Sequence, residues 1–79
     1  MSNHDILNQL KPFISSEKEI SLQTPCMEFL DSFGFIQLLL QAESVFGITI
    51  EDDDLFLGHY TVANDIVDMV KRHILERGK

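Results

Sequence analysis

Apolar residues recur at intervals of three or four positions in three stretches of the chain, the spacing of one buried helix face. Ser2 or Asn3 can cap the first stretch. Pro12 lies near its end and cannot donate the backbone hydrogen bond of a continuing helix, so we expect a kink or an early end there. The apolar positions of this first helix are Ile6, Leu7, Leu10, Phe13 and Ile14.

The second and third stretches carry clear signals at their ends. The second helix is predicted to begin near Ser32 and to end near Gly47, which suits a left-handed C-terminal cap. Thr61 can cap the third helix. The apolar side of the third helix consists of Val62, Ala63, Ile66, Val67, Val70 and Ile74.

Two connections complete the predicted fold. Residues 15–30 form a long loop, which we expect Ile20, Leu22 and Leu30 to anchor to the core. After Gly47, Asp52 or Asp53 can cap a short helical turn through residues 55–57. No stretch alternates apolar and polar residues over a useful length. The sequence therefore predicts an all-α fold, a small four-helix bundle of three main helices and one short helix, as a single domain over residues 1–79.

The second helix has more apolar surface than one buried face uses. At about 100° per residue, one broad core face forms, and a wet face lies opposite it. The wet face holds Gln37, Gln41 and Ser44. A second apolar stripe, Phe33, Ile36 and Leu40, begins beside Ser32. It is either further core under a loop or an exposed docking strip for a partner protein. The core face holds Phe35, Leu38, Leu39, Ala42, Val45 and Phe46.

Length and charge narrow the possible functions. A chain of 79 residues buries somewhat over roughly 60% of its unfolded surface, which leaves little room for a deep pocket beside a core. Thirteen acidic and six basic side chains give a formal net charge of −7. Such a surface repels phosphate backbones, so we expect no nucleic-acid partner. Basic protein surfaces are the favoured partners.

Several features indicate a soluble protein in the reducing cytoplasm, and we expect it to be a monomer. The single cysteine, Cys26, cannot form an intramolecular disulfide. The first residues, MSNHDILNQL, lack the pattern of a signal peptide. No apolar run approaches the roughly 20 residues that cross a bilayer, so we expect no stable membrane insertion.

A polar pair, Asp31-Ser32, precedes the second helix. Asp31 is well placed as the N-cap, accepting a hydrogen bond from the backbone N–H of Phe33 or Gly34. Ser32 then lies in the first turn, where free N–H groups and the helix dipole favour an anion. A phosphodiester on the Ser32 hydroxyl would lie in that field. Alone, the pair also fits an ordinary capping motif.

In its setting, the pair resembles the attachment motif of the acyl carrier protein family, or phosphopantetheine-attachment domain. The resemblance covers about residues 28–70, and the matching stretches are LDSFGFIQLLL, ESVFGITIEDDDL and YTVANDIVDMV. It implies a four-helix bundle in which a phosphopantetheinyl transferase attaches 4′-phosphopantetheine to Ser32. It also implies that partner enzymes recognise the helix after the serine, on which Phe33, Ile36 and Leu40 lie.

By this resemblance the chain is a carrier and not an enzyme. The thiol of the covalent arm would hold an acyl or aminoacyl cargo as a thioester, which a ligase or acyltransferase loads and downstream enzymes use. The pathway stays open among fatty-acid, polyketide, nonribosomal-peptide and D-alanine types. Phe33 and Gly34 replace the Leu and acidic residue common in the family, and acidity is concentrated in residues 51–54. DSFG with QLLL is more similar to D-alanyl carriers and other free-standing aminoacyl or peptidyl carriers, although the final part of the chain does not follow the D-alanyl pattern closely. We therefore favour a specialised carrier over the fatty-acid one.

Other chemistry fits the sequence less well. Cys26 has no neighbouring base in the sequence, so we interpret it as a plain loop thiol. EDDDLFLG lacks the alternating ligands of a calcium loop, so we expect no metal site. The alternative to a carrier is a helical adaptor domain that binds a protein through the Phe33, Ile36 and Leu40 stripe without a prosthetic group.

Overall fold

The computed structural model of the protein describes residues 2–14 and 19–77. They form three α-helices, α1 (Asn3–Leu10), α2 (Ser32–Phe46) and α3 (Ala63–Arg77). Four 3₁₀ turns lie between them: η1 (Lys11–Phe13), η2 (Cys26–Glu28), η3 (Asp52–Asp54) and η4 (Leu57–His59). Apart from one isolated β-bridge, between Pro25 and Val62, the described residues contain no β-structure. The prediction of an all-helical fold is confirmed.

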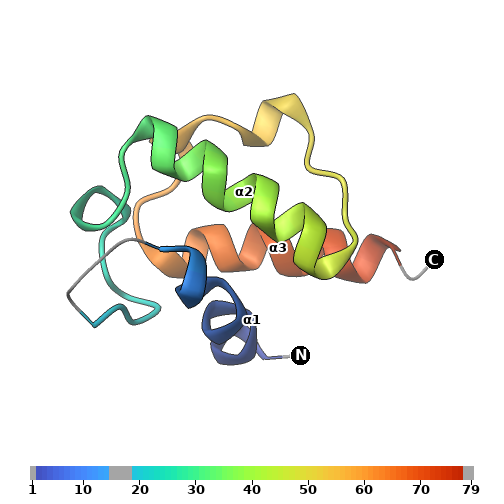
Figure 1. Ribbon diagram of the computed structural model, residues 1–79, viewed down its shortest axis with the longest axis horizontal. Helices are drawn as coiled ribbons and strands as arrows, with labels where there is room; N and C mark the ends of the chain where they lie inside the picture. The colour runs from blue at the N-terminus through green and yellow to red at the C-terminus, as the bar shows by residue number, and fades with distance from the viewer. Residues whose placement is uncertain (1, 15–18, 78–79) are drawn as a thin grey trace.

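α2 and α3 begin at the same end of the molecule and run in the same general direction (Figure 1). α1 lies below both helices in this view. This arrangement explains the connection after Gly47, which must return along the whole of α2. Fifteen helical residues span about 22 Å. A single short helix would cover little of that distance. The chain makes two separate 3₁₀ turns, η3 and η4, so the predicted fourth helix at residues 55–57 is not confirmed.

α1 begins with a capping box at Ser2. The Ser2 hydroxyl accepts a hydrogen bond from the Asp5 N–H (3.2 Å), and the Ser2 N–H donates one to the Asp5 carboxylate (3.1 Å). These bonds to Ser2 lower the pKa of Asp5. As Pro12 predicted, the helix ends early, at Leu10. The 3₁₀ turn that follows winds more tightly, and Phe13 leaves the apolar stripe and is exposed, contrary to the sequence prediction.

α2 has the predicted ends, because both signals are local. The Asp31 side chain caps it, and Gly47 adopts the left-handed conformation (φ 63°) as its N–H bonds to the Glu43 carbonyl. Val45 was predicted to be in the core, but it is exposed. It lies at the edge of the core face, away from the η3–η4 segment, which covers the opposite edge. The core residues of α2 are Phe35, Leu38, Leu39, Ala42 and Phe46.

α3 begins two residues after the predicted cap, Thr61. The Asp65 carboxylate organises this start by accepting hydrogen bonds from the backbone N–H groups of Thr61 (2.9 Å) and Val62 (3.1 Å). No bond from the Thr61 hydroxyl is recorded among the described residues. Val62 and Ile74, predicted for the apolar side, are half-buried. The buried residues are Ala63, Ile66, Val67, Met69 and Val70.

The loop between α1 and α2 is fixed to the start of α3 where it is described. The Cys26 N–H donates to the Thr61 carbonyl (2.9 Å), and the Ala63 N–H donates to the Thr24 carbonyl (2.9 Å). As predicted, Ile20, Leu22 and Leu30 anchor it: Ile20 and Leu30 are buried, and Leu22 packs partly buried against the core. Residues 15–18 of the predicted loop lie outside the described residues. The fixed part of this loop sets the position of the residues that lead into α2.

Candidate functional site

Ser32 is the first residue of α2 and is exposed. The preceding Asp31 has an extended backbone, and its carboxylate accepts a hydrogen bond of 2.6 Å from the Gly34 N–H. Its carbonyl oxygen accepts a second bond, of 2.9 Å, from the Phe35 N–H. Among the described residues, no acceptor is recorded for the N–H groups of Ser32 and Phe33. Two unpaired donors and the positive end of the helix dipole therefore lie beside the serine hydroxyl.

The lack of a side chain at Gly34 leaves space for the Asp31 carboxylate that caps α2. A Cβ atom at this position would lie 3.0 Å from the Asp31 Oδ1 atom, closer than such contacts normally come. The absence of a side chain thus allows the short hydrogen bond between Asp31 and the Gly34 N–H. Because the cap fixes where α2 begins, it also places Ser32 in the first turn of the helix.

Two surface grooves meet at this end of the molecule, and Met27 lines both. We name the first the Ser32 groove; it has a volume of about 310 Å³. We name the second the Asp31 groove; it has a volume of about 530 Å³. The Ser32 groove is lined by Met27, Ser32, Phe35, Ile36, Leu55, Phe56, Leu57 and Gly58. The Asp31 groove is lined by Phe13, Met27, Glu28, Phe29, Leu30, Asp31, Phe33, Gly34 and Gln37.

The predicted stripe on α2 is only partly open. Phe33 and Leu40 have 72% and 56% of their surface exposed, whereas Ile36 is partly buried and packs against the core. The reason is tertiary, because Ile36 lines the Ser32 groove together with Leu55, on the side that the η3–η4 segment covers. Gln37, on the wet face beside the stripe, is exposed.

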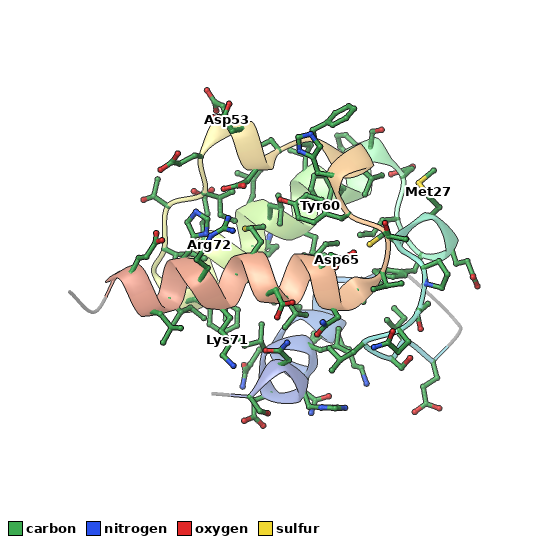
Figure 2. The ribbon with its side chains drawn as sticks, turned by 180° about the vertical axis from the view of Figure 1, so that it is seen from behind. Met27, Asp53, Tyr60, Asp65, Lys71 and Arg72 are labelled. Atoms are coloured by element: carbon green, nitrogen blue, oxygen red, sulfur yellow. The ribbon has the colours of Figure 1, made fainter. Side chains whose placement is uncertain are left out.

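α2 contains one ionisable residue, Glu43, whose carboxylate accepts a hydrogen bond of 2.9 Å from the Ile50 N–H. The outward face that holds Phe33, Gln37 and Leu40 has no ionisable side chain. The acidic groups gather instead on η3, where Asp52 and Asp53 are exposed and Asp53 points away from the body of the molecule (Figure 2). A partner that approaches α2 directly therefore meets apolar and amide side chains.

Asp54, the third acidic residue of η3, joins this turn to α3. Its carboxylate lies 3.5 Å from Arg72 Nη2 and 3.4 Å from His73 Nε2, and its carbonyl accepts a hydrogen bond of 2.8 Å from the Tyr60 hydroxyl. Burial raises the pKa of Tyr60. These contacts hold the η3–η4 segment in place over α3, so that it forms one wall of the Ser32 groove.

Sequence reasoning missed Met27 and Phe56, which flank the Ser32 groove. Both are strongly exposed, with Phe56 at 62%, and the Phe56 ring meets His59 edge-on with the ring centroids 4.9 Å apart. They lie in irregular segments, where hydrophobic periodicity gives no signal. Met27 marks the end of the molecule where α2 begins (Figure 2).

Cys26 is fully buried, and burial raises the pKa of its thiol to about 11. An inert thiol of this kind agrees with its interpretation as a structural loop residue. Among the described residues, no group of three or more His, Cys, Asp or Glu side chains is placed to hold a metal ion. Within the same part of the chain, no helix is both long and apolar enough to span a membrane.

Comparison with known families identifies the class of protein. The family model described as the phosphopantetheine attachment site matches residues 7–70. This range covers most of the described chain and includes Met27, which lines both grooves. Domains of this class are helical carriers that bear covalently attached 4′-phosphopantetheine, and they are in general not catalytic. The chain belongs to this phosphopantetheine-attachment family. Searches of curated proteins and of solved structures gave no significant match.

Proposed function

We propose that the protein is an acyl or aminoacyl carrier whose 4′-phosphopantetheine is attached to Ser32. The observation that carries this proposal is the exposed Ser32 hydroxyl on the first residue of α2, beside a capped helix end. The matched family region supports it, because it spans this serine. The function follows from exposure at a rigid helix end, which leaves the attachment point open to a modifying enzyme.

The residues around Ser32 suit a phosphodiester. The unpaired N–H groups of Ser32 and Phe33 can donate hydrogen bonds to its oxygens, and the dipole of the 15-residue α2 favours its negative charge. The Asp31 carboxylate is bound to the Gly34 N–H, which holds the helix end in this geometry. When attached, the arm supplies a terminal thiol that holds cargo as a thioester. The chain's own residues present this thiol to enzymes and do not catalyse its reactions.

This proposal favours a specialised carrier over the fatty-acid one and leaves the cargo open among fatty-acyl, polyketide, aminoacyl or peptidyl, and D-alanyl groups. The uncharged outward face of α2 supports a specialised carrier, because Phe33, Gln37 and Leu40 offer no charge to the basic patches of fatty-acid enzymes. The partners are a phosphopantetheinyl transferase, a loading ligase or acyltransferase, and downstream enzymes. The single unpaired cysteine supports a reducing compartment, the cytoplasm.

Attachment is tested by intact mass spectrometry. The purified apo-protein is incubated with coenzyme A and a broad-specificity phosphopantetheinyl transferase, and the adduct is then mapped by peptide fragmentation. We expect the mass of one arm on Ser32 and no gain for Ser32→Ala. Ser44→Ala is the matched control, because Ser44 is an exposed serine on the same helix, and it should gain the full mass. No gain by the wild-type protein would refute the proposal and leave the adaptor alternative.

We also propose that partner enzymes dock on the stripe, chiefly on its exposed members Phe33 and Leu40. Leu40→Asp should lower kcat/KM for arm transfer by about fivefold or more, the effect of losing a contact worth about 1 kcal/mol. Leu75→Asp is the control, since Leu75 is 64% exposed on α3. Both variants should keep the wild-type helicity. Equal effects on kcat/KM would refute docking on the stripe, and unfolding of Leu40→Asp would identify Leu40 as a packing residue.

A further inference from the structure

A pair of aromatic rings lies between the Ser32 groove and the interior of the protein. Phe35 lines this groove from the core side, and only 1% of its surface is exposed. We infer that the rings of Phe35 and Tyr60 close the space between the helices to the cargo. The cargo then stays outside and is short or polar, of the short-chain acyl or aminoacyl class. This inference rests on the proposed attachment at Ser32 and adds the class of cargo.

Phe35 is held in place at its backbone and at its ring. Its N–H donates a hydrogen bond of 2.9 Å to the Asp31 carbonyl, in the first turn of α2. Its ring belongs to the buried core and meets the Tyr60 ring at a tilt of 44°, with the ring centroids 5.3 Å apart. A cargo chain that enters from the Ser32 groove therefore reaches the Phe35 ring first.

Tyr60 is held by two further segments. Its hydroxyl donates a hydrogen bond of 2.8 Å to the carbonyl of Asp54, on η3. The Asp54 carboxylate in turn lies 3.5 Å from Arg72 Nη2 and 3.4 Å from His73 Nε2, both on α3. Turning the Tyr60 ring aside would break the hydrogen bond to Asp54. The ring therefore supports Phe35 at a fixed position.

The helices leave little free space elsewhere between them. In the described part of the chain, an apolar cavity lined by side chains of α1, α2 and α3 has a volume of about 10 Å³, at most the room of one water molecule. Protein interiors are packed as densely as organic crystals, and insertion of further atoms forces side chains out of their preferred positions. A cargo chain could thus enter only by displacing a core side chain.

The size of the Phe35 side chain sets a limit for such an exchange. Displacing it would move about seven carbon atoms from the core to water, while the cargo would recover burial in proportion to its own apolar area. An acetyl, butyryl or aminoacyl group has less apolar area than this benzyl group. Its entry would expose more apolar surface than it buries, so the ring stays in place.

A cargo that stays outside must be compatible with water. A long alkyl chain would expose apolar surface along its whole length, which is unfavourable. An aminoacyl group carries a charged ammonium, and a short acyl group has few carbon atoms, so water solvates both. The closed interior therefore fits short acyl and aminoacyl groups and does not fit long fatty chains.

Acyl groups of increasing length test whether the interior takes cargo. A broad-specificity phosphopantetheinyl transferase transfers the acylated arm from acetyl-, butyryl-, hexanoyl- or octanoyl-coenzyme A to the apo-protein, with adenosine bisphosphate as the leaving group. A cargo that is buried only in the folded state would raise the thermal unfolding midpoint in step with its length. We expect the same midpoint for the whole series. A midpoint that rises with chain length would overturn the inference.

Phe35→Val tests the role of the ring. The variant leaves apolar space beside the Ser32 groove, and engineered apolar cavities bind apolar ligands. Its octanoyl form should therefore unfold at a higher temperature than its acetyl form. Phe13→Val, a change of an exposed phenylalanine outside this groove, should show no such difference. Equal midpoints for the two forms of Phe35→Val would refute the role of the ring.

Nuclear Overhauser contacts in the wild type give a measurement that does not depend on the stability of a variant. The protein is labelled with ¹³C and loaded with an unlabelled octanoyl arm. Contacts from the terminal methyl group of the cargo to the buried methyl groups of Leu39 or Ile66 would overturn the inference, and we expect none. Mass spectrometry separates two levels of failure. A protein that gains no arm refutes the proposed function, while a loaded protein that buries its cargo refutes the cargo class alone.

Discussion

Replacing Cys26 with alanine should remove a loss of stability that the wild-type protein suffers in alkaline solution. The Cys26 thiol has no exposed surface, and burial raises its pKa from 9.0 to about 11. The folded state therefore holds the thiol proton more tightly than the unfolded state. Between pH 9 and pH 11, unfolding releases this proton, so the free energy of unfolding falls as pH rises. Below pH 9 both states are protonated and the contribution is constant.

The size of the effect follows from the two pKa values. A rise from 9.0 to about 11 corresponds to about 2.7 kcal/mol of preference for the neutral thiol, lost fully only above pH 11. At pH 10.5, integration of the proton linkage gives a loss of about 2 kcal/mol relative to pH 7.5. Tyr60 also has a raised pKa, but its titration is common to the wild type and the variant. The difference between the two proteins thus isolates Cys26.

Urea unfolding of both proteins at pH 7.5 and pH 10.5 measures this difference. The wild type should lose about 2 kcal/mol more than Cys26→Ala between the two pH values. The same losses in both proteins would refute the reasoning, because Cys26 would then titrate as an exposed thiol. Burial should also make the Cys26 thiol unreactive in the folded protein, which Ellman's reagent tests at pH 8. The native apo-protein should react slowly, the protein in guanidinium should react fast, and the native holo-protein should show one fast thiol, that of the arm.

Three further predictions concern the scaffold around Ser32. Asp31→Ala should lower the free energy of unfolding by about 1 kcal/mol, because the Gly34 N–H loses its acceptor, and Asp31→Asn should retain most of it in urea titrations. Phe35→Ala should lower the free energy of unfolding by about 3–5 kcal/mol, because the Phe35 ring is buried. Phe33→Ala should change it by no more than about 0.5 kcal/mol, because the Phe33 ring is exposed. Similar thermal shifts for the two variants would contradict this assignment. Gly47→Ala should cost about 1 kcal/mol at the left-handed helix end, and an unchanged unfolding midpoint would exclude strain there.

The uncharged face of α2 has a consequence for recognition. Attraction between exposed charges weakens as salt screens it, whereas contacts of Phe33 and Leu40 with an apolar partner surface do not depend on it in this way. The acidic residues Asp52 and Asp53 lie on η3, a separate segment from α2. If partner enzymes dock on the stripe as proposed, these acidic residues would speed the encounter with a basic enzyme and the stripe would supply the contact area. Two separate surfaces would then set the rate and the strength of docking.

Local signals in the sequence determined the position of α2 and of its first residue. The Asp31 side chain and Gly47 act on the nearest turn of backbone only, so their effect can be read without knowledge of the rest of the fold. The early end of α1 before Pro12 has the same origin. The exposure of Ser32 follows from these signals, because the residue directly after the N-cap lies in the first turn, at the end of the helix.

Tertiary structure decided which edges of α2 are covered and what surrounds Ser32. Helical geometry alone put Val45 nearer the centre of the core face than Ile36, yet Val45 is exposed and Ile36 is partly buried, because the η3–η4 segment returns along one side of the helix. That return path also brings Phe56 to a groove shared with Met27, 29 positions earlier in the chain. Periodicity describes the faces of one element, whereas contacts between irregular segments depend on where the whole chain runs.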